Sequence, residues 1–213
     1  MSLYKDYLKY TVRDWFEKNA EPHEIKHAAA AFEGDAQAAF KLSIALENRK
    51  RGIIAVAMWR CKVPVEAFRV FLSSVWYHDH RSVIESAGNR RTLGHMFHYA
   101  AFPLPSELPD VMQVWRGTSF VSLKQAKAGY SWTTDRDTAC WFAMRYANPN
   151  GFPLVLTGEI AKCDVSLFLN ELSESEIVTL RAPTSRIDGD VNDWTGCFER
   201  KDAINKEANN NLM

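Results

Sequence analysis

Two glutamates stand one residue apart at the entrance to a β-branched stretch of the chain. Glu174 and Glu176 come immediately before Ile177-Val178-Thr179, a composition that favours a strand. Side chains two residues apart in a strand share a face, so the sequence predicts that both carboxylates point the same way. Like charges side by side are unfavourable without a cationic partner. The pair therefore indicates either a solvated strand entrance or a site.

Two earlier strand candidates carry groups that complement these carboxylates. Arg116 ends one of them, and Ser131 and Thr133 alternate along the other. A guanidinium can hold a phosphate or a ribose with its rigid fork of donors, and a serine hydroxyl can fix a glutamate by hydrogen bonding. A glutamate placed in this way can accept from a ribose hydroxyl and stabilise positive charge on the sugar. Cleavage of an N-glycosidic bond through an oxocarbenium-like state requires both.

The elements that must position these groups lie in the C-terminal half of the chain. Alternating aromatic and β-branched residues predict strands, and Asp135 is suited to cap a helix. Two stretches have a less regular pattern, which indicates a short helix or loop in one and a last strand in the other. The expected strands are 111–117, 130–134, 153–160 and 174–180, with a helix at 138–146, a short helix or loop at 164–169 and a last strand within 189–200.

The N-terminal half has the periodicity of helices. Apolar residues recur at spacings of three and four, Pro22 and Pro64 are suited to helix starts, and Asp35 is suited to cap a helix with Phe40, Ile44 and Ala45 on its buried stripe. The expected helices are 2–20, 22–34, 36–49, 52–59, one that Pro64 opens, and 90–101.

Three prolines at positions 103, 105 and 109 predict an extended junction between the two halves. The sequence thus predicts an α+β protein with a helical region over 1–102 and a β-rich region over 103–213. Equal numbers of basic and acidic residues, 26 each, argue against a general electrostatic attraction to nucleic acid.

Cysteines, histidines and hydropathy restrict the classes of site further. Cys61, Cys140, Cys163 and Cys197 lack the spacing of a zinc or redox motif, so buried free thiols in a reducing cytoplasm are expected. The pairs His78/His80 and His95/His98 do not form an HExxH pattern, and no metal is expected. Early charged residues argue against a signal peptide, and no apolar run is long enough to span a bilayer. A soluble cytoplasmic protein is therefore expected.

The order of these motifs resembles a known family. Arg116-Gly117, then Ser131-Trp132-Thr133 followed by a helix with Ala-x-x-Phe-Ala, then Glu174-Ser175-Glu176 entering a strand, is similar to the Arg-Ser-Glu class of mono-ADP-ribosyltransferases, with bacterial toxin, ecto-enzyme and phage members. The resemblance covers roughly residues 111–181. It implies a mixed, mainly antiparallel split β-sheet of the ADP-ribosyltransferase type. Tryptophan at the centre of the second motif departs from the Ser-Thr-Ser form.

The resemblance also implies roles for individual residues. Arg116 would contact the phosphates or nicotinamide ribose of the co-substrate NAD⁺, and the backbone of Gly117 would hold the nicotinamide amide, where a residue without a Cβ permits close approach. Ser131 would orient the catalytic Glu176, and Thr133 would support the site.

Two further roles concern the acceptor and the nicotinamide ring. Glu174 would engage the acceptor nucleophile, and glutamate at this position goes with arginine acceptors in the family. Phe142, Tyr146 and Phe152 are the candidates for stacking on nicotinamide, and the sequence does not rank them.

The resemblance implies transfer of ADP-ribose from NAD⁺ to a protein acceptor, in a phage-type or toxin–antitoxin modifier that acts in the cytoplasm of a bacterium or a phage-infected host. An antitoxin-like or inhibitor protein would be a possible partner of the helical half. Three alternatives remain open: an RNA or DNA acceptor, NAD⁺ hydrolysis without transfer, and a binding module without catalysis. For a nucleic-acid acceptor the candidate basic residues are Arg49, Lys50, Arg51, Arg90, Arg91, Lys124 and Lys127.

Overall fold

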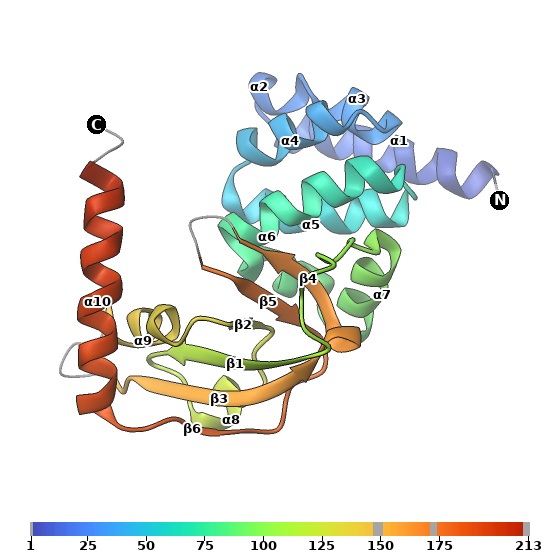
Figure 1. Ribbon diagram of the computed structural model, residues 1–213. Helices are drawn as coiled ribbons and strands as arrows, with labels where there is room; N and C mark the ends of the chain where they lie inside the picture. Colours follow the sequence, from blue (N-terminus) through green and yellow to red (C-terminus); the bar gives the residue numbers. More distant parts are fainter. Residues whose placement is uncertain (1, 147–150, 171–173, 211–213) are drawn as a thin grey trace. The chain divides into compact units, whose positions relative to one another are not determined.

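The computed structural model describes residues 2–146, 151–170 and 174–210. The chain divides into two compact units, Met1–Phe102 and Pro103–Met213. The first unit is helical and the second carries the sheet (Figure 1). The α+β class is therefore as the sequence predicts.

Local capping signals explain where the helices of the first unit begin and end. The Asp35 carboxylate accepts from the Ala38 N–H at the start of α4, Pro64 stands at the N-cap of α6, and Gly34 ends α3 in the left-handed conformation that favours glycine. The helices are α1 Ser2–Asn19, α2 Pro22–Ile25, α3 Ala28–Glu33, α4 Ala36–Ala45, α5 Asn48–Arg60, α6 Val65–Ala87 and α7 Arg90–Ala100.

Two helix predictions in this unit are wrong in their bounds. The helix expected over 22–34 is two helices, and the one expected over 36–49 ends at Ala45 because Leu46 turns into extended backbone. The buried Glu24 explains this turn, since its carboxylate accepts from the Glu47 N–H at 3.1 Å and from Lys50 Nζ at 2.7 Å. Lys50 therefore forms an internal ion pair with Glu24 and does not contribute its charge to a basic surface.

The core of the first unit is centred on α6, which packs against α4, α5 and α7. Phe68, Phe71 and Trp76 of α6 are fully buried together with Met96 of α7. In contrast, Phe40 and Ile44 are exposed, so the predicted buried stripe of α4 is wrong. The residues of α4 that face the core are Ala38, Ala39, Leu42 and Ser43.

The second unit is built on one six-stranded sheet with the order β4-β5-β2-β1-β3-β6. All pairings between its described strands are antiparallel, so the mixed character expected from the resemblance is not observed. The strands are β1 Val111–Thr118, β2 Ser131–Thr133, β3 Leu154–Ala161, β4 Val165–Leu169, β5 Glu176–Thr179 and β6 Ser185–Ile187.

Two halves of this sheet are joined at a narrow point. The strands β1 and β2 share a single register pair, Trp115 with Thr133, whereas β1 pairs with β3 along all eight of its residues. Beyond the Trp115–Thr133 pair the two strands therefore separate, and a fork opens between them.

Each face of the sheet has its own apolar cluster. Met112, Val114, Trp132, Leu156 and Ile177 form one with Ala126 of the short helix α8, Leu123–Lys127. On the other face α9, Arg136–Met144, packs against β1, and α10, Val191–Asn210, packs against α9 (Figure 1).

Three predictions in this unit are wrong. Residues 164–169 are the end of the 3₁₀ turn Lys162–Asp164 and the strand β4 instead of a short helix or loop. Residues 191–200 lie in α10 instead of a last strand. The strand expected over 174–180 begins only at Glu176. The burial of Val165, Leu167 and Leu169 alternates with that of their neighbours, which is the two-residue period of a half-buried strand.

Candidate functional site

Three adjacent strands carry the residues that the sequence singles out. The sheet order places β2, with Ser131 and Thr133, between β1, with Arg116, and β5, with Glu176. Thr133 pairs directly with Glu176, and Ser131 pairs with Val178. Paired residues share a face, so Ser131, Thr133 and Glu176 lie on one side of the sheet with Ser131 diagonal to Glu176.

Arg116 lies at the fork between β1 and β2. Alternation along β1 places it on the face of Val114, opposite to Trp115, but its Nη1 reaches the Ser131 carbonyl at 2.5 Å because the strands have separated there. The guanidinium packs against Gly129, where any Cβ would collide with it. Gly129 is thus a requirement of the Arg116 position that the sequence did not reveal.

The charge of Arg116 is poorly compensated. Burial lowers the pKa of its guanidinium, and the negative charge of Glu176 opposes that shift. Its Nε is buried and has no hydrogen-bond acceptor within the part of the chain that the structure describes. A buried donor of this kind is unusual in a folded protein, and a water, an ion or a ligand can supply the missing acceptor.

Thr133 connects the second motif to the glutamate pair. Its hydroxyl donates to the Glu174 carbonyl at 2.6 Å and accepts from the Asp135 N–H at 3.0 Å. The Thr134 N–H donates to the Ser175 carbonyl at 3.2 Å. The end of β2 therefore holds the main chain of the glutamate pair in place.

The two glutamates do not share a strand face. Ser175 between them has φ +47°, in the left-handed region that a β-branched or bulky residue avoids, and its hydroxyl contacts the Asn170 side chain at 3.0 Å. The alternation argument holds only within regular strand, and β5 starts at Glu176. The basis of the prediction that both carboxylates point the same way is therefore wrong, because Glu174 lies outside the strand.

Glu174 has an environment of its own. Burial raises the pKa of its carboxyl, and the positive charges of Arg145 and Lys201 oppose that shift. Glu176 instead acts on the charge of Arg116. The two carboxylates consequently face different cationic groups, which permits different roles.

Sequence reasoning missed Lys201, which comes from α10. This lysine is buried, and its Nζ lies 3.3 Å from the Asp135 carboxylate. Asp135 also accepts from the Thr138 hydroxyl at 2.6 Å and from the Asp137 N–H at 3.0 Å. The buried residues Trp194, Cys197 and Lys201 have the i, i+3, i+7 spacing of a helix face. This spacing can be seen in the sequence and favours a helix over the predicted strand.

The aromatic candidates differ in how far their side chains are exposed. Phe142 is half-buried, and the Arg145 guanidinium lies 4.4 Å from its ring centroid and 4.4 Å from that of Trp141. Tyr146 and Phe152 are exposed. Phe142 is thus the candidate best fixed in position, and a cation already lies over its ring.

The missing side chain at Gly117 has a packing reason. A Cβ at this position would collide with the Ala139 carbonyl of α9. The glycine is therefore required for α9 to pack closely on β1. Whether or not its backbone also contacts a ligand, this packing alone accounts for the residue.

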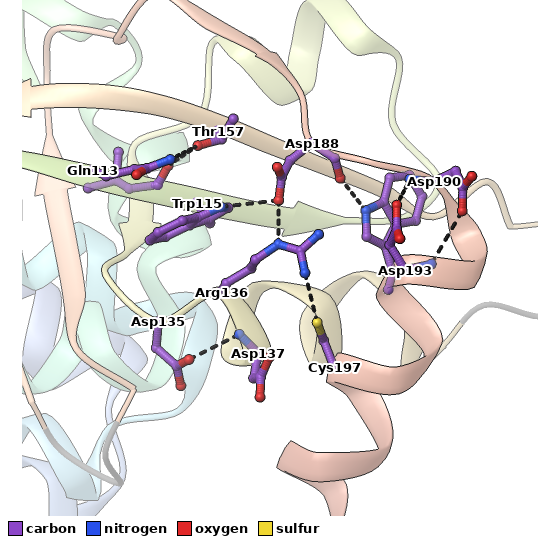
Figure 2. Close-up of polar contacts among 12 residues, drawn as sticks. Gln113, Trp115, Asp135, Arg136, Asp137, Thr157, Asp188, Asp190, Asp193 and Cys197 are labelled. Atoms are coloured by element: carbon purple, nitrogen blue, oxygen red, sulfur yellow. Dashed lines mark hydrogen bonds and ion pairs between the residues drawn. The ribbon is translucent and has the colours of Figure 1, made fainter.

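A polar network next to the site fixes α9 and α10 to the sheet (Figure 2). The Asp188 carboxylate accepts from Arg136 Nε at 2.6 Å and from Trp115 Nε1 at 3.1 Å. The Asp188 carbonyl accepts from the Trp194 indole, and Arg136 Nη1 lies 3.0 Å from Cys197 Sγ. Asp188 therefore fixes the indole of Trp115, and the strand pairing with Thr133 fixes its backbone.

Comparison of the chain with protein-family models, with curated proteins and with solved structures finds no match. Within the described residues no three His, Cys, Asp or Glu side chains are grouped as they would be around a metal ion. None of the helices in the described ranges has the length and apolar content of a membrane span.

Proposed function

We propose that the protein is a mono-ADP-ribosyltransferase that moves ADP-ribose from NAD⁺ to a macromolecular acceptor. The observation that carries the proposal is that Arg116, the Ser131–Thr133 strand and Glu176 lie on three neighbouring strands, with Glu174 just before the start of the third. These groups come from positions up to 60 residues apart in the sequence. Their convergence supports one site rather than three unrelated polar strand ends.

The binding of NAD⁺ in the proposal rests on the fork. The Arg116 Nε has no acceptor within the described chain, so a phosphate or ribose oxygen of NAD⁺ supplies one. Burial strengthens an ionic hydrogen bond of this kind. Ser131 lies next to Arg116 and diagonal to Glu176, where it orients the glutamate.

The proposed reaction breaks the N-glycosidic bond of the nicotinamide ribose. Nicotinamide leaves with the bonding electron pair, and positive charge develops on the sugar. Glu176 accepts from the ribose 2′-hydroxyl and stabilises that charge. An acceptor nitrogen then forms the new bond to C1′, and its proton passes to Glu174. A protein arginine is the acceptor that the resemblance favours for glutamate at this position.

The direct test is incubation with NAD⁺ labelled in the adenylate moiety, followed by mass spectrometry of macromolecules from bacterial cytoplasm. The wild-type chain is compared with Glu176→Ala, and with Glu199→Ala as a matched control because Glu199 is an exposed carboxylate of the same unit. We expect label on protein arginines with wild type and the control, and none with Glu176→Ala. Label on RNA or DNA would change the acceptor, and free ADP-ribose alone would indicate hydrolysis. Full activity in Glu176→Ala would refute the assignment.

A further inference from the structure

A groove lies beside β3, away from the residues discussed above. Its volume is about 660 Å³, and it lies between Thr157–Ala161 of β3 on one side and residues 181–186 on the other. None of Arg116, Ser131, Thr133, Glu174 and Glu176 lines it. A cavity of this size has the dimensions of a ligand site.

The outer edge of β3 is only partly covered. The strand extends to Ala161, but β6 pairs with it only from Leu156 to Gly158. Residues 159–161 are therefore paired with β1 on one side and lack a strand on the other within the described chain.

The hydrogen bonds identify which backbone groups face the open side. The Asp188 N–H donates to the Val155 carbonyl, and the Lys162 N–H donates to the Asp110 carbonyl beside β1. Because N–H and C=O groups alternate sides along a strand, odd-numbered residues of β3 point away from β1. The N–H and C=O of Glu159 and the N–H of Ala161 thus point into the groove, and no backbone partner for these three groups occurs within the described ranges. The Ala161 carbonyl instead begins the 3₁₀ turn Lys162–Asp164.

The opposite wall explains why the groove stays open. At Gly158 the chain leading to β6 comes so close that a Cβ would lie 2.8 Å from the Thr184 carbonyl oxygen. Further along, Arg181 Nη1 lies 3.6 Å from the Asp164 carboxylate, which holds the wall away from the edge. The two walls are therefore in contact at Gly158 and separate over the last three residues of β3.

The lining of the groove is polar. Gln113 Nε2 donates to the Thr157 hydroxyl at 3.3 Å (Figure 2), and Arg186 pairs with Thr157 on the same face. The Ser185 hydroxyl is buried and has no hydrogen-bond partner within the described residues. Glu159 and Arg186 are exposed charges of opposite sign. These groups suit a polar occupant with its own donors and acceptors.

We infer that the groove binds an extended segment of a partner protein, which adds a strand to the outer edge of β3. The segment exchanges main-chain hydrogen bonds with Glu159 and accepts from the Ala161 N–H, and alternate side chains of the segment supply specificity. A basic side chain is favoured opposite Glu159, since directly paired residues share a face. This inference does not depend on NAD⁺ chemistry, and it gives the protein a peptide-binding surface separate from its proposed catalytic residues.

A proline substitution tests the main-chain contact. Ala161 has φ −75°, close to the value that proline requires, and its N–H faces the groove rather than β1. Ala161→Pro therefore removes one edge donor without breaking the β1–β3 ladder. Ala161→Ser, which keeps the N–H, is the matched control. Circular dichroism confirms that both variants are folded.

Linear peptides displayed on phage are selected against the full wild-type chain, and the best binders are measured by calorimetry. We expect binders with a basic residue whose affinity falls at least tenfold in Ala161→Pro and stays unchanged in Ala161→Ser. Hydrogen exchange by NMR should show fast exchange of the Glu159 and Ala161 amides in the free protein and slow exchange with peptide.

The inference is overturned by failure to select any linear binder, by binding that Ala161→Pro leaves unchanged, or by protection of amides elsewhere in the chain. Slow exchange at Glu159 and Ala161 in the free protein, together with self-association in ultracentrifugation, would show that a second copy occupies the edge, and this too would overturn the proposed partner.

Discussion

Arg136 at the start of α9 donates to Asp188 at 2.6 Å although 52 residues separate them in the sequence. The exposed fractions of the two side chains are 32% and 23%, so water screens the pair less than it screens a surface ion pair. Asp188 also accepts from Trp115. One carboxylate thus ties the start of α9 to the centre of the sheet.

Replacing Asp188 by alanine should destabilise the second unit. The change leaves the Arg136 and Trp115 donors without their acceptor, and we expect a loss of about 1–3 kcal/mol in the free energy of unfolding. Urea denaturation followed by tryptophan fluorescence measures it. Lys206→Ala, which removes an exposed i,i+4 pair with Asp202 on α10, should change stability by less than about 0.5 kcal/mol. Equal effects of the two substitutions would contradict the structural role of Asp188.

The first unit should lose stability in acid through Glu24. Burial by itself would raise the pKa of this carboxyl, but Lys50 and the N–H groups of Glu21 and Glu47 outweigh it, so the pKa is lowered. A lowered folded-state pKa contributes stability above the unfolded value of about 4.5, and that contribution disappears as pH falls through the folded value. In Glu24→Gln we expect lower stability at pH 7 and a flatter decline between pH 5 and pH 3 in urea titrations. A decline as steep as that of wild type would show that other groups govern acid unfolding.

The elements with strong local signals could be predicted from sequence. The Asp35 and Asp135 caps, the helical character of the first unit and the strands β1, β2 and β3 follow from capping residues and from periods of 3.6 and 2. Ser122 and Gln125 form a capping box at α8, and Asp190 accepts from the Asn192 and Asp193 N–H groups at the start of α10. These last two signals are also present in the sequence and indicate α8 and the start of α10.

The remaining parts depend on long-range contacts. The left-handed Ser175 between the glutamates depends on β2, whose Thr133 and Thr134 bind the main chain on either side of it. Lys201 reaches Asp135 only because α10 packs on α9. The sequence could therefore indicate which residues belong to the candidate site, but it could not indicate how the two carboxylates are oriented or which cations face them.

The four thiols should differ widely in reactivity. Cys163 is exposed, whereas Cys61, Cys140 and Cys197 are buried. Burial, with a further contribution from the neighbouring Cys197, raises the pKa of Cys140 to about 12, so its thiolate is scarce at pH 8. Titration of the native protein with Ellman's reagent should show one fast thiol, which Cys163→Ser removes. A fast phase that persists in Cys163→Ser would show that a buried thiol is accessible.

Gly117→Ala should separate the packing role of this glycine from any contact with nicotinamide. The new Cβ would collide with the Ala139 carbonyl, and main-chain overpacking of this kind costs about 1–3 kcal/mol or more. Gly196→Ala is the matched control, because its nearest neighbour would be Arg200 Nη1 at 3.8 Å and alanine gains up to about 1 kcal/mol in a helix. Thermal unfolding measures both. A stable Gly117→Ala protein that fails to bind NAD⁺ would instead favour a direct ligand role.

The different cationic surroundings of Glu174 and Glu176 lead to the sharpest catalytic prediction. Glu176 acts on Arg116, so Glu176→Gln should abolish both NAD⁺ cleavage and transfer. Glu174→Gln should reduce transfer at least tenfold and spare cleavage.

The pH profile gives Glu174 an independent test. Because burial raises the pKa of Glu174, its base form is lost at a higher pH than for an ordinary glutamate. Wild-type transfer should therefore decline on acidification before cleavage does, and this separation should vanish in Glu174→Gln. Nicotinamide release and acceptor labelling, measured in the same samples from pH 4 to pH 8, give both rates. If cleavage and transfer are lost in parallel in both Glu174→Gln and Glu176→Gln, the proposed division of roles is contradicted. One shared function of the two glutamates would then explain the result.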